Sequence, residues 1–140
     1  MWKRALLCVL YLSFVSSYSI AEEQSVQKSE QTKNDYQYFQ LEPDIITNYI
    51  KPGKRIGYIR LTVELMMNSK SNYAVIDEHE PLIRDKIITI LGQQTEVIVK
   101  SVAERDGIRQ RCLDEINELL YVETGKRPLE DLLFTKYLYQ

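Results

Sequence analysis

The segment Ile56–Met67, IGYIRLTVELMM, decides the fold of this chain because it alternates apolar and polar residues over a full strand length. Its odd-numbered positions from residue 59 onward are all apolar: Ile59, Leu61, Val63, Leu65 and Met67. Arg60, Thr62 and Glu64 occupy even positions between them. A period of two places successive side chains on opposite faces of a strand. The segment therefore predicts a strand with one face in the core and the other toward solvent or a partner.

Stretches before and after this segment also predict strands. Residues 36–43, YQYFQLEP, alternate well enough to start a strand, and Pro43 marks it as an edge or as broken there, because proline lacks the amide donor of a sheet ladder. Residues 44–50 continue in extended form. Pro52-Gly53 then indicates a turn, in which the glycine accepts a positive φ. Residues 132–140, LLFTKYLYQ, predict a final strand.

The region between the second and the last strand is predicted to be helical. Residues 73–94 carry apolar side chains at spacings of three and four, and Pro81 either begins a second helical segment or kinks the first. Ser101 and Glu104 have the spacing of a capping box. Gly125 is a natural helix stop. A second apolar stripe precedes it, made by Ile108, Cys112, Ile116, Leu119 and Leu120.

These elements predict an α+β fold with the order β-β-α-α-β. We expect a small mixed sheet of three to four strands with the helices packed on one face. Two helices between strands give the length that a parallel or mixed pairing needs, and such a crossover is right-handed. The chain has 140 residues, enough for one core, and we place that domain at residues 36–140.

The first 21 residues are predicted to be a secretory signal peptide. Lys3 and Arg4 form a short basic region, an apolar run follows, and Ser19 and Ala21 supply the small side chains that a leader peptidase needs before the cut. Cleavage is expected after Ala21. The alternative is a short membrane anchor: residues 5–21 carry no charge and as a helix would cover about 25 Å, slightly less than a bilayer core. Both alternatives export the rest of the chain.

Residues 22–35, EEQSVQKSEQTKND, are predicted to be a flexible linker. Val26 is their single aliphatic residue, so they cannot bury enough surface to offset their chain entropy. The linker is either a solvated tail or a tether that sets the distance from the membrane. Without the leader, 16 basic and 20 acidic side chains give a net charge of -4 and leave Cys112 as the one cysteine. It cannot form an internal disulfide, and we expect it to be buried on its apolar stripe.

No set of residues for catalysis or cofactor binding is predicted. His79 is flanked by Asp77, Glu78 and Glu80, but consecutive helical residues point about 100° apart and cannot converge on one metal ion. A dyad of His79 with Cys112 would need the thiol to leave the apolar stripe. We therefore expect no enzymatic activity, no metal and no cofactor.

The overall composition also excludes several classes of protein. With 18 basic and 20 acidic residues, the chain lacks the basic excess of a nucleic-acid-binding protein. Residues 51–57 resemble a phosphate-binding loop in composition only, because the Walker spacing is missing. The unusual number is tyrosine, which supplies 10 of the 14 aromatic residues.

Three stretches together resemble the FliL family, the flagellar basal-body-associated proteins of bacteria. The first is YFQLEP at residues 38–43, which opens the domain. The second is HEPLIR at residues 79–84, followed by the apolar helix and two glutamines. The third is residues 116–140, which include DLLFT and end in glutamine. They occur in the family's order, and the resemblance extends from residue 36 to residue 140.

This resemblance implies a non-enzymatic protein of the periplasm, associated with the inner membrane at the flagellar basal body. The family's domain is similar to the stomatin and prohibitin type, which assembles into rings. Its implied role is to encircle or contact the stator units and to support flagellar rotation, swimming or swarming. Family members usually carry a cytoplasmic tail and a full membrane span, whereas the apolar run here is short. If that run is cleaved, membrane attachment must come from partners, as in an auxiliary paralogue.

Exposed strand edges are an independent reason to expect assembly, because their unpaired backbone groups can join subunits head to tail. The candidate residues for partner binding or self-association are Tyr36, Tyr38, Arg84, Tyr137 and Tyr139. The same tyrosines could instead only cover the sheet. A hypothesis from a different class is a soluble periplasmic module that binds a peptide or glycan, since tyrosines on a one-sided sheet also suit such ligands.

Overall fold

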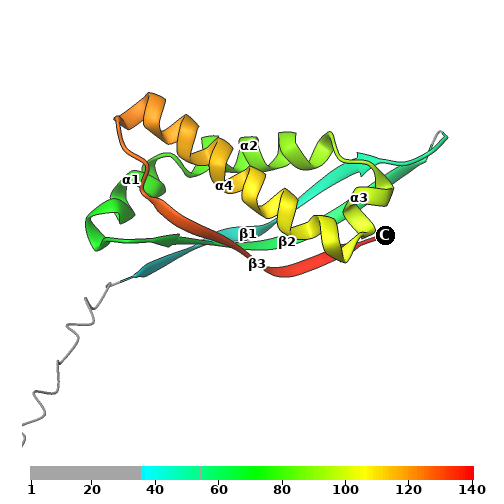
Figure 1. Ribbon diagram of the computed structural model, residues 1–140, viewed down its shortest axis with the longest axis horizontal. Coiled ribbons are helices and arrows are strands. Elements are labelled where there is room, and N and C mark those ends of the chain that lie inside the picture. Colours follow the sequence, from blue (N-terminus) through cyan, green and yellow to red (C-terminus); the bar gives the residue numbers. More distant parts are fainter. Residues whose placement is uncertain (1–35, 54) are drawn as a thin grey trace, which may run out of the picture. The chain divides into compact units, whose positions relative to one another are not determined.

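The computed structural model describes residues 36–53 and 55–140, so the predicted signal peptide (1–21) and linker (22–35) lie outside the described residues. Figure 1 shows helices on one face of a curved sheet. The elements follow in this order: β1 (Gln37–Ile50), β2 (Ile56–Met67), a 3-10 turn (Lys70–Asn72), α1 (Tyr73–Glu78), α2 (Glu80–Gly92), α3 (Glu96–Lys100), α4 (Val102–Thr124) and β3 (Leu129–Tyr139). The predicted α+β class with helices on one face is confirmed.

Strand β2 is the centre of the three-stranded sheet, whose order is β1-β2-β3. Leu65, for example, lies opposite Phe39 of β1 and Leu132 of β3. The five apolar residues at odd positions of β2 are all fully buried: Ile59, Leu61, Val63, Leu65 and Met67. The core face predicted from the period of two is therefore confirmed.

Strand β1 runs through Pro43 instead of ending there. Residues 37–50 form one strand, and the pairing with β2 shifts register between Leu41 and Ile45. Pro43 lies inside this irregularity and on an edge strand, where a missing amide donor costs no ladder hydrogen bond. The prediction that Pro43 lies on an edge strand is confirmed. The strand does not break at Pro43, and only its register with β2 shifts there. The turn that follows holds Gly53 at φ +82°, as the Pro-Gly signal predicted.

The prediction of parallel or mixed pairing was wrong, because both strand pairs are antiparallel and the described part of the chain forms three strands. The reason is the path of the helices. Helix α2 ends beside the far end of β1, where the Ile50 amide donates to the Gln94 carbonyl at 2.8 Å. Helix α4 returns, and Asn117 in its C-terminal half contacts Leu129 at the start of β3. Helix α2 thus runs along the sheet away from the end of β2, and α4 runs back toward it. Strand β3 therefore begins at the end of the sheet where β2 stops.

The helical region has four α-helices where two were expected. Pro81 occupies the first turn of α2, and His79 separates α2 from α1, so the proline begins a second segment as one of the two alternatives predicted. Ser101 caps α4 by accepting the Glu104 amide at 3.2 Å. Gly125 ends α4 at φ +71°. Both predicted ends of α4 are therefore confirmed, while the short α3 was not foreseen.

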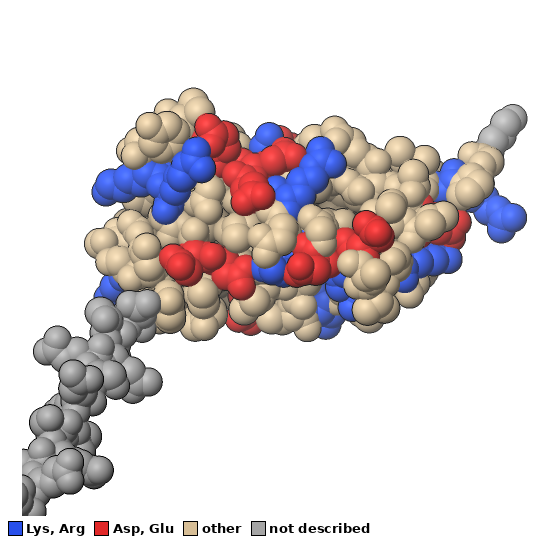
Figure 2. Space-filling view, viewed as in Figure 1, with Lys and Arg blue, Asp and Glu red and all other residues tan. Residues whose placement is uncertain are grey.

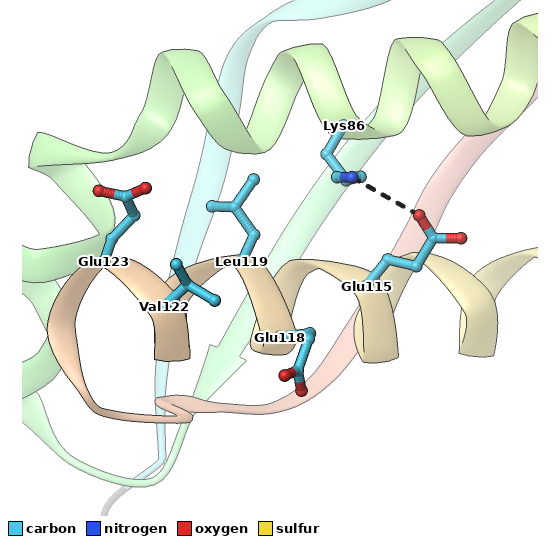
Figure 3. A pocket seen from close by; sticks show the side chains of 6 residues that line it. All are labelled: Lys86, Glu115, Glu118, Leu119, Val122 and Glu123. Carbon is cyan, nitrogen blue, oxygen red and sulfur yellow. Dashed lines mark ion pairs between the residues drawn. The ribbon is translucent and has the colours of Figure 1, made fainter.

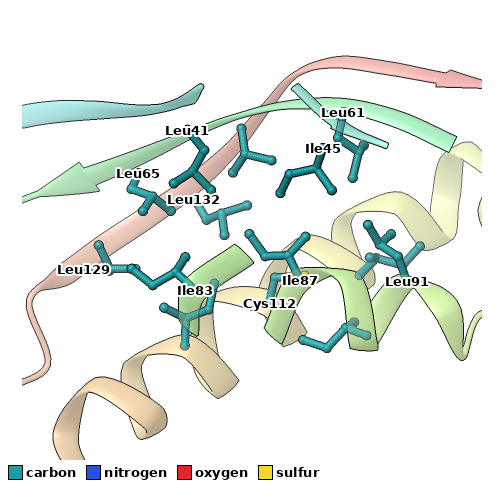
Figure 4. Close-up of a cluster of buried hydrophobic side chains, with 14 of the residues drawn as sticks. Leu41, Ile45, Leu61, Leu65, Ile83, Ile87, Leu91, Cys112, Leu129 and Leu132 are labelled. Atoms are coloured by element: carbon teal, nitrogen blue, oxygen red, sulfur yellow. The ribbon is translucent and has the colours of Figure 1, made fainter. Parts of the chain in front are cut away.

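The core lies between the sheet and helices α2 and α4, as the close-up in Figure 4 shows. Ile83 and Ile87 of α2 and Cys112 of α4 are fully buried there. Burial of Cys112, the expectation from its apolar stripe, is confirmed. Burial also raises the pKa of its thiol to about 12, so the thiol stays protonated at neutral pH.

The contact between Tyr49 and Gly57 predicts a large effect of one methyl group. The two residues lie opposite each other on β1 and β2, and a Cβ added at Gly57 would come within 2.2 Å of the Tyr49 ring. We expect Gly57→Ala to lower the free energy of unfolding by about 1–3 kcal/mol. Gly107 lies in α4 with open space around it, so Gly107→Ala should raise that free energy by up to about 1 kcal/mol.

The two variants form a matched pair for urea denaturation followed by circular dichroism. Opposite shifts of the denaturation midpoint, with unchanged slope, are the expected result. Equal stability of wild type and Gly57→Ala would show that the tyrosine ring moves aside at no cost.

Candidate partner-binding surfaces

The candidate tyrosines lie at opposite ends of the sheet and on its two different edge strands. Tyr38 of β1 is opposite Met66, whereas Tyr139 of β3 is opposite Ile59, seven residues along β2. At about 3.3 Å per residue this separates the two ends by roughly 23 Å. The structure therefore does not bring the four tyrosines into one site, and it gives two separate surfaces.

The first surface is at the start of β1. Tyr38 is 54% exposed and Tyr36 is 36% exposed. The next residue, Phe39, faces the core, and its ring packs against the Tyr73 ring with centroids 5.1 Å apart. Tyr38 thus presents an aromatic side chain to solvent from a backbone that the core holds in place.

The second surface is at the end of β3, where the two tyrosines differ in role. Tyr137 is half-buried and donates its hydroxyl to the Val99 carbonyl at 3.1 Å. Burial raises the pKa of Tyr137 to about 12, although Arg105 lies 4.4 Å from its ring centre and acts in the opposite direction. Tyr139 is 41% exposed and packs its ring against that of Tyr137. Tyr137 therefore joins β3 to α3, and Tyr139 is the accessible ring.

Arg84 lies on α2 and is mostly enclosed. Its Nε donates to the Glu80 carboxylate at 2.7 Å, and 20% of its side chain is exposed. Its Nη2 is buried without a hydrogen-bond partner. Helix α2 lies above the sheet and is not part of a strand edge (Figure 1). The argument from exposed strand edges therefore does not apply to Arg84, and its role in assembly stays a prediction.

The acidic neighbours of His79 do not form a metal site. His79 lies at the junction of α1 and α2, with Nδ1 2.8 Å from the Val75 carbonyl, so that nitrogen carries the proton and donates. Cys112 is enclosed in the core. Within residues 36–53 and 55–140, no group of three histidine, cysteine or carboxylate side chains is placed to hold a metal ion.

A cluster on the helix-free face of the sheet was missed by sequence reasoning. Asp44 accepts hydrogen bonds from Arg60 at 2.6 Å and from Thr62 at 2.7 Å, and Lys136 lies 3.6 Å away. The cluster links all three strands. The alternation of Arg60 and Thr62 along β2 placed them on one face, but the register that brings Asp44 beside them depends on the irregularity at Pro43.

The same face of the sheet is otherwise apolar near the β1–β2 turn. Ile46 is 63% exposed, Tyr58 48% and Leu138 56%. They line a shallow cavity of about 340 Å³ together with Arg60, Tyr139 and Gln140. No described helix covers these residues, so the face is open to solvent or to a partner.

A second cavity lies between α2 and α4 (Figure 3). Its volume is about 400 Å³, and Leu119 and Val122 form its apolar part. Lys86 of α2 and Glu115 of α4 pair across it at 3.7 Å. Glu118 and Glu123 complete an acidic rim, but Glu118 is already paired with Arg127. Figure 2 shows acidic and basic side chains interspersed over this side of the molecule, with no large patch of one sign.

The amino-acid sequence is similar to that of known proteins. Residues 38–140 match the family described as Flagellar basal body-associated protein FliL. The chain is 28% identical over 102 residues to a protein of Aquifex aeolicus (strain VF5) named Flagellar protein FliL. The matched part covers 73% of this chain and 60% of that relative.

The match over residues 38–140 defines the class of protein: a protein associated with the flagellar basal body. The chain belongs to the FliL family. Among residues 36–53 and 55–140, no helix is long and apolar enough to span a bilayer.

The Asp44 cluster predicts a contribution to stability that depends on pH. Hydrogen bonds from Thr62 and Arg60 lower the pKa of Asp44 below its ordinary value of 3.8. A lowered pKa in the folded state stabilises the fold above the ordinary value, and that stabilisation is lost as the pH falls through the folded pKa. We therefore expect wild type to exceed Asp44→Asn in stability at pH 6 and to lose much of this advantage near pH 2. Thermal melts across that pH range measure it, and a difference that is constant with pH would contradict it.

Proposed function

We propose that this chain is an exported, non-enzymatic accessory protein that forms a ring around, or contacts, the stator units of the flagellar motor and supports rotation, swimming or swarming. Membership of the FliL family carries the association with the flagellar basal body. The periplasmic location, the association with the inner membrane and the identity of the motor partner go beyond that membership and form part of the proposal.

The arrangement of the tyrosines supports self-assembly. A ring needs head-to-tail contacts, in which two different surfaces of each subunit meet. The candidate surfaces lie on different edge strands and at opposite ends of the sheet, with Tyr38 and Tyr139 as their exposed rings. Exposed aromatic rings contribute a large apolar area at low entropic cost. Helices at the rim of the domain, such as α2 with Arg84, are the other possible contact.

The motor function is tested by deleting the gene and complementing it with matched tyrosine variants. Deletion should reduce swimming and swarming, above all in viscous medium where the motor works under load. Tyr38→Ser should fail to restore motility fully, because it removes an exposed ring from the β1 end. Tyr121→Ser is the control, since Tyr121 is 50% exposed on α4 and belongs to neither edge strand. Unchanged motility of the deletion strain in viscous medium would refute the motor function.

The alternative function, a periplasmic module that binds a peptide or glycan, has one supporting observation. The open sheet face holds a cavity of about 340 Å³ with Tyr58 and Leu138 in its wall. A deletion strain with normal motility whose purified protein binds peptides or glycans would favour this function. A Tyr58→Ser variant should then lose the ligand.

The fate of the N-terminal segment decides how the domain is attached to the membrane. Cleavage after Ala21 predicts Glu22 as the first residue of the protein isolated from the cell envelope. Amino-terminal sequencing measures this directly. An intact Met1 would show that the segment is kept as an anchor.

A further inference from the structure

Arg105 of α4 carries a charge that the described chain does not compensate. None of the ion pairs within residues 36–53 and 55–140 includes it, and its Nε is buried without a hydrogen-bond acceptor. Its guanidinium lies over the Tyr137 ring at 4.4 Å. An aromatic face attracts a cation but does not replace a carboxylate, so the site retains affinity for an anion.

The guanidinium borders a cavity of about 300 Å³ between the first turns of α4 and the middle of β3. The neighbouring cation, Arg109, is paired with Asp106 at 2.8 Å and with Asp131. Val102, which is 77% exposed, and the half-buried Leu133 and Phe134 form the apolar wall. Arg105 is therefore the unpaired charge of a small and largely apolar recess.

The recess adjoins an edge of β3 that is closed over one half of its length. Asn117 both donates to the Leu129 carbonyl at 2.9 Å and accepts the Leu129 amide at 3.1 Å. The Leu132 amide donates to Asp131 and its carbonyl accepts from Arg109. Side chains thus satisfy the first half of this edge, and no added strand can pair there without displacing them.

The second half of the edge is open. Gln140 pairs with Tyr58 of β2 in both directions, at 3.0 and 3.3 Å. Backbone groups of an antiparallel strand alternate in direction, so the amides and carbonyls of Tyr137 and Tyr139 point away from β2. The described part of the chain supplies no hydrogen-bond partner to these outward groups. A strand that pairs here would meet unpaired donors and acceptors.

We propose that residues 134–139 bind an extended segment of another protein as an added strand, and that Arg105 binds an acidic side chain of that segment. Directly opposed residues of neighbouring strands have Cβ atoms about 4.5–5.5 Å apart. A residue placed beside Tyr137 therefore comes within reach of the guanidinium that covers the Tyr137 ring. The backbone pairs give affinity and the carboxylate gives selectivity, as in other cases of strand addition.

The charge pattern favours a different protein over a second copy of this chain. In a head-to-tail contact a second copy would offer its β1 edge, whose core-facing residues are not acidic: Phe39, Leu41, Ile45, Thr47 and Tyr49. The inference rests on the proposed function only for the expectation that the chain works inside an assembly. It gives the β3 edge, Tyr139 included, to a different protein, so a contact between copies would use the other candidates, Tyr38 and helix α2. The binding assay below requires no motor, so its outcome is independent of motility.

The test uses the purified full-length chain in detergent and a blocked seven-residue peptide in which valine and glutamate alternate. The same peptide with glutamine in place of glutamate is the charge control. Fluorescence anisotropy measures affinity, and hydrogen–deuterium exchange measures protection of residues 133–139. Arg105→Gln is the test variant. Arg111→Gln is the control, since Arg111 is on the same helix with half of its side chain exposed and pairs with Glu115.

We expect the glutamate peptide to bind, to protect residues 133–139 and to leave residues 37–50 unchanged. Arg105→Gln and the glutamine peptide should each weaken binding by about tenfold, the loss of one charge-assisted hydrogen bond. Equal binding by both peptides, or an unchanged affinity of Arg105→Gln, would overturn the role of Arg105. Protection of residues 133–139 without peptide, lost on dilution, would assign this edge to a second copy and would overturn the assignment to another protein.

Discussion

The burial of one face of β2 is the constraint on which the rest of the structure depends. Five apolar side chains of this strand are fully enclosed between the neighbouring strands and helices α2 and α4. Each contributes about 1.5–3 kcal/mol relative to exposure, so a slip of one residue would expose all five at a large cost. This fixed register also sets the outer face, because it leaves Tyr58 and Arg60 of β2, with Ile46 and Leu138 opposite Arg60, on the side without helices.

The path of the helices then determines which strand edges are free. Because α2 runs away from the end of β2 and α4 returns to it, β3 enters the sheet antiparallel and beside β2. Had the chain crossed the sheet only once, β3 would have started at the opposite end and paired in parallel. The out-and-back path therefore explains why the exposed tyrosines of the two edge strands lie at opposite ends of the sheet.

The local parts of the fold could be predicted from the sequence, and the pairing could not. The period of two in β2, the proline at the start of α2 and the cap at Ser101 are signals carried by neighbouring residues. The direction of β3 depends on the path of the helices across the sheet. Two helices were expected, but α2 and α4 run out and back, which returns the chain to the end where β2 stops and gives an antiparallel strand. Likewise, the exposure of Tyr38 can be predicted from the alternation of residues along its strand. The enclosure of Tyr137 depends on its hydrogen bond to the Val99 carbonyl, and Val99 is distant in sequence.

Helix α4 illustrates how the same element can both close and open a binding surface. Arg105 and Arg109 are four residues apart and therefore lie on one side of the helix, toward β3. Arg109 has two carboxylates and the Leu132 carbonyl around it, and in pairing with them it closes the first half of the β3 edge. Arg105 has an aromatic ring and no carboxylate, and the edge beside it stays open. The difference between the two halves of the edge therefore follows from the side chains beside it: Asn117, Arg109 and Asp131 satisfy the first half, and Arg105 has no carboxylate partner within the described chain.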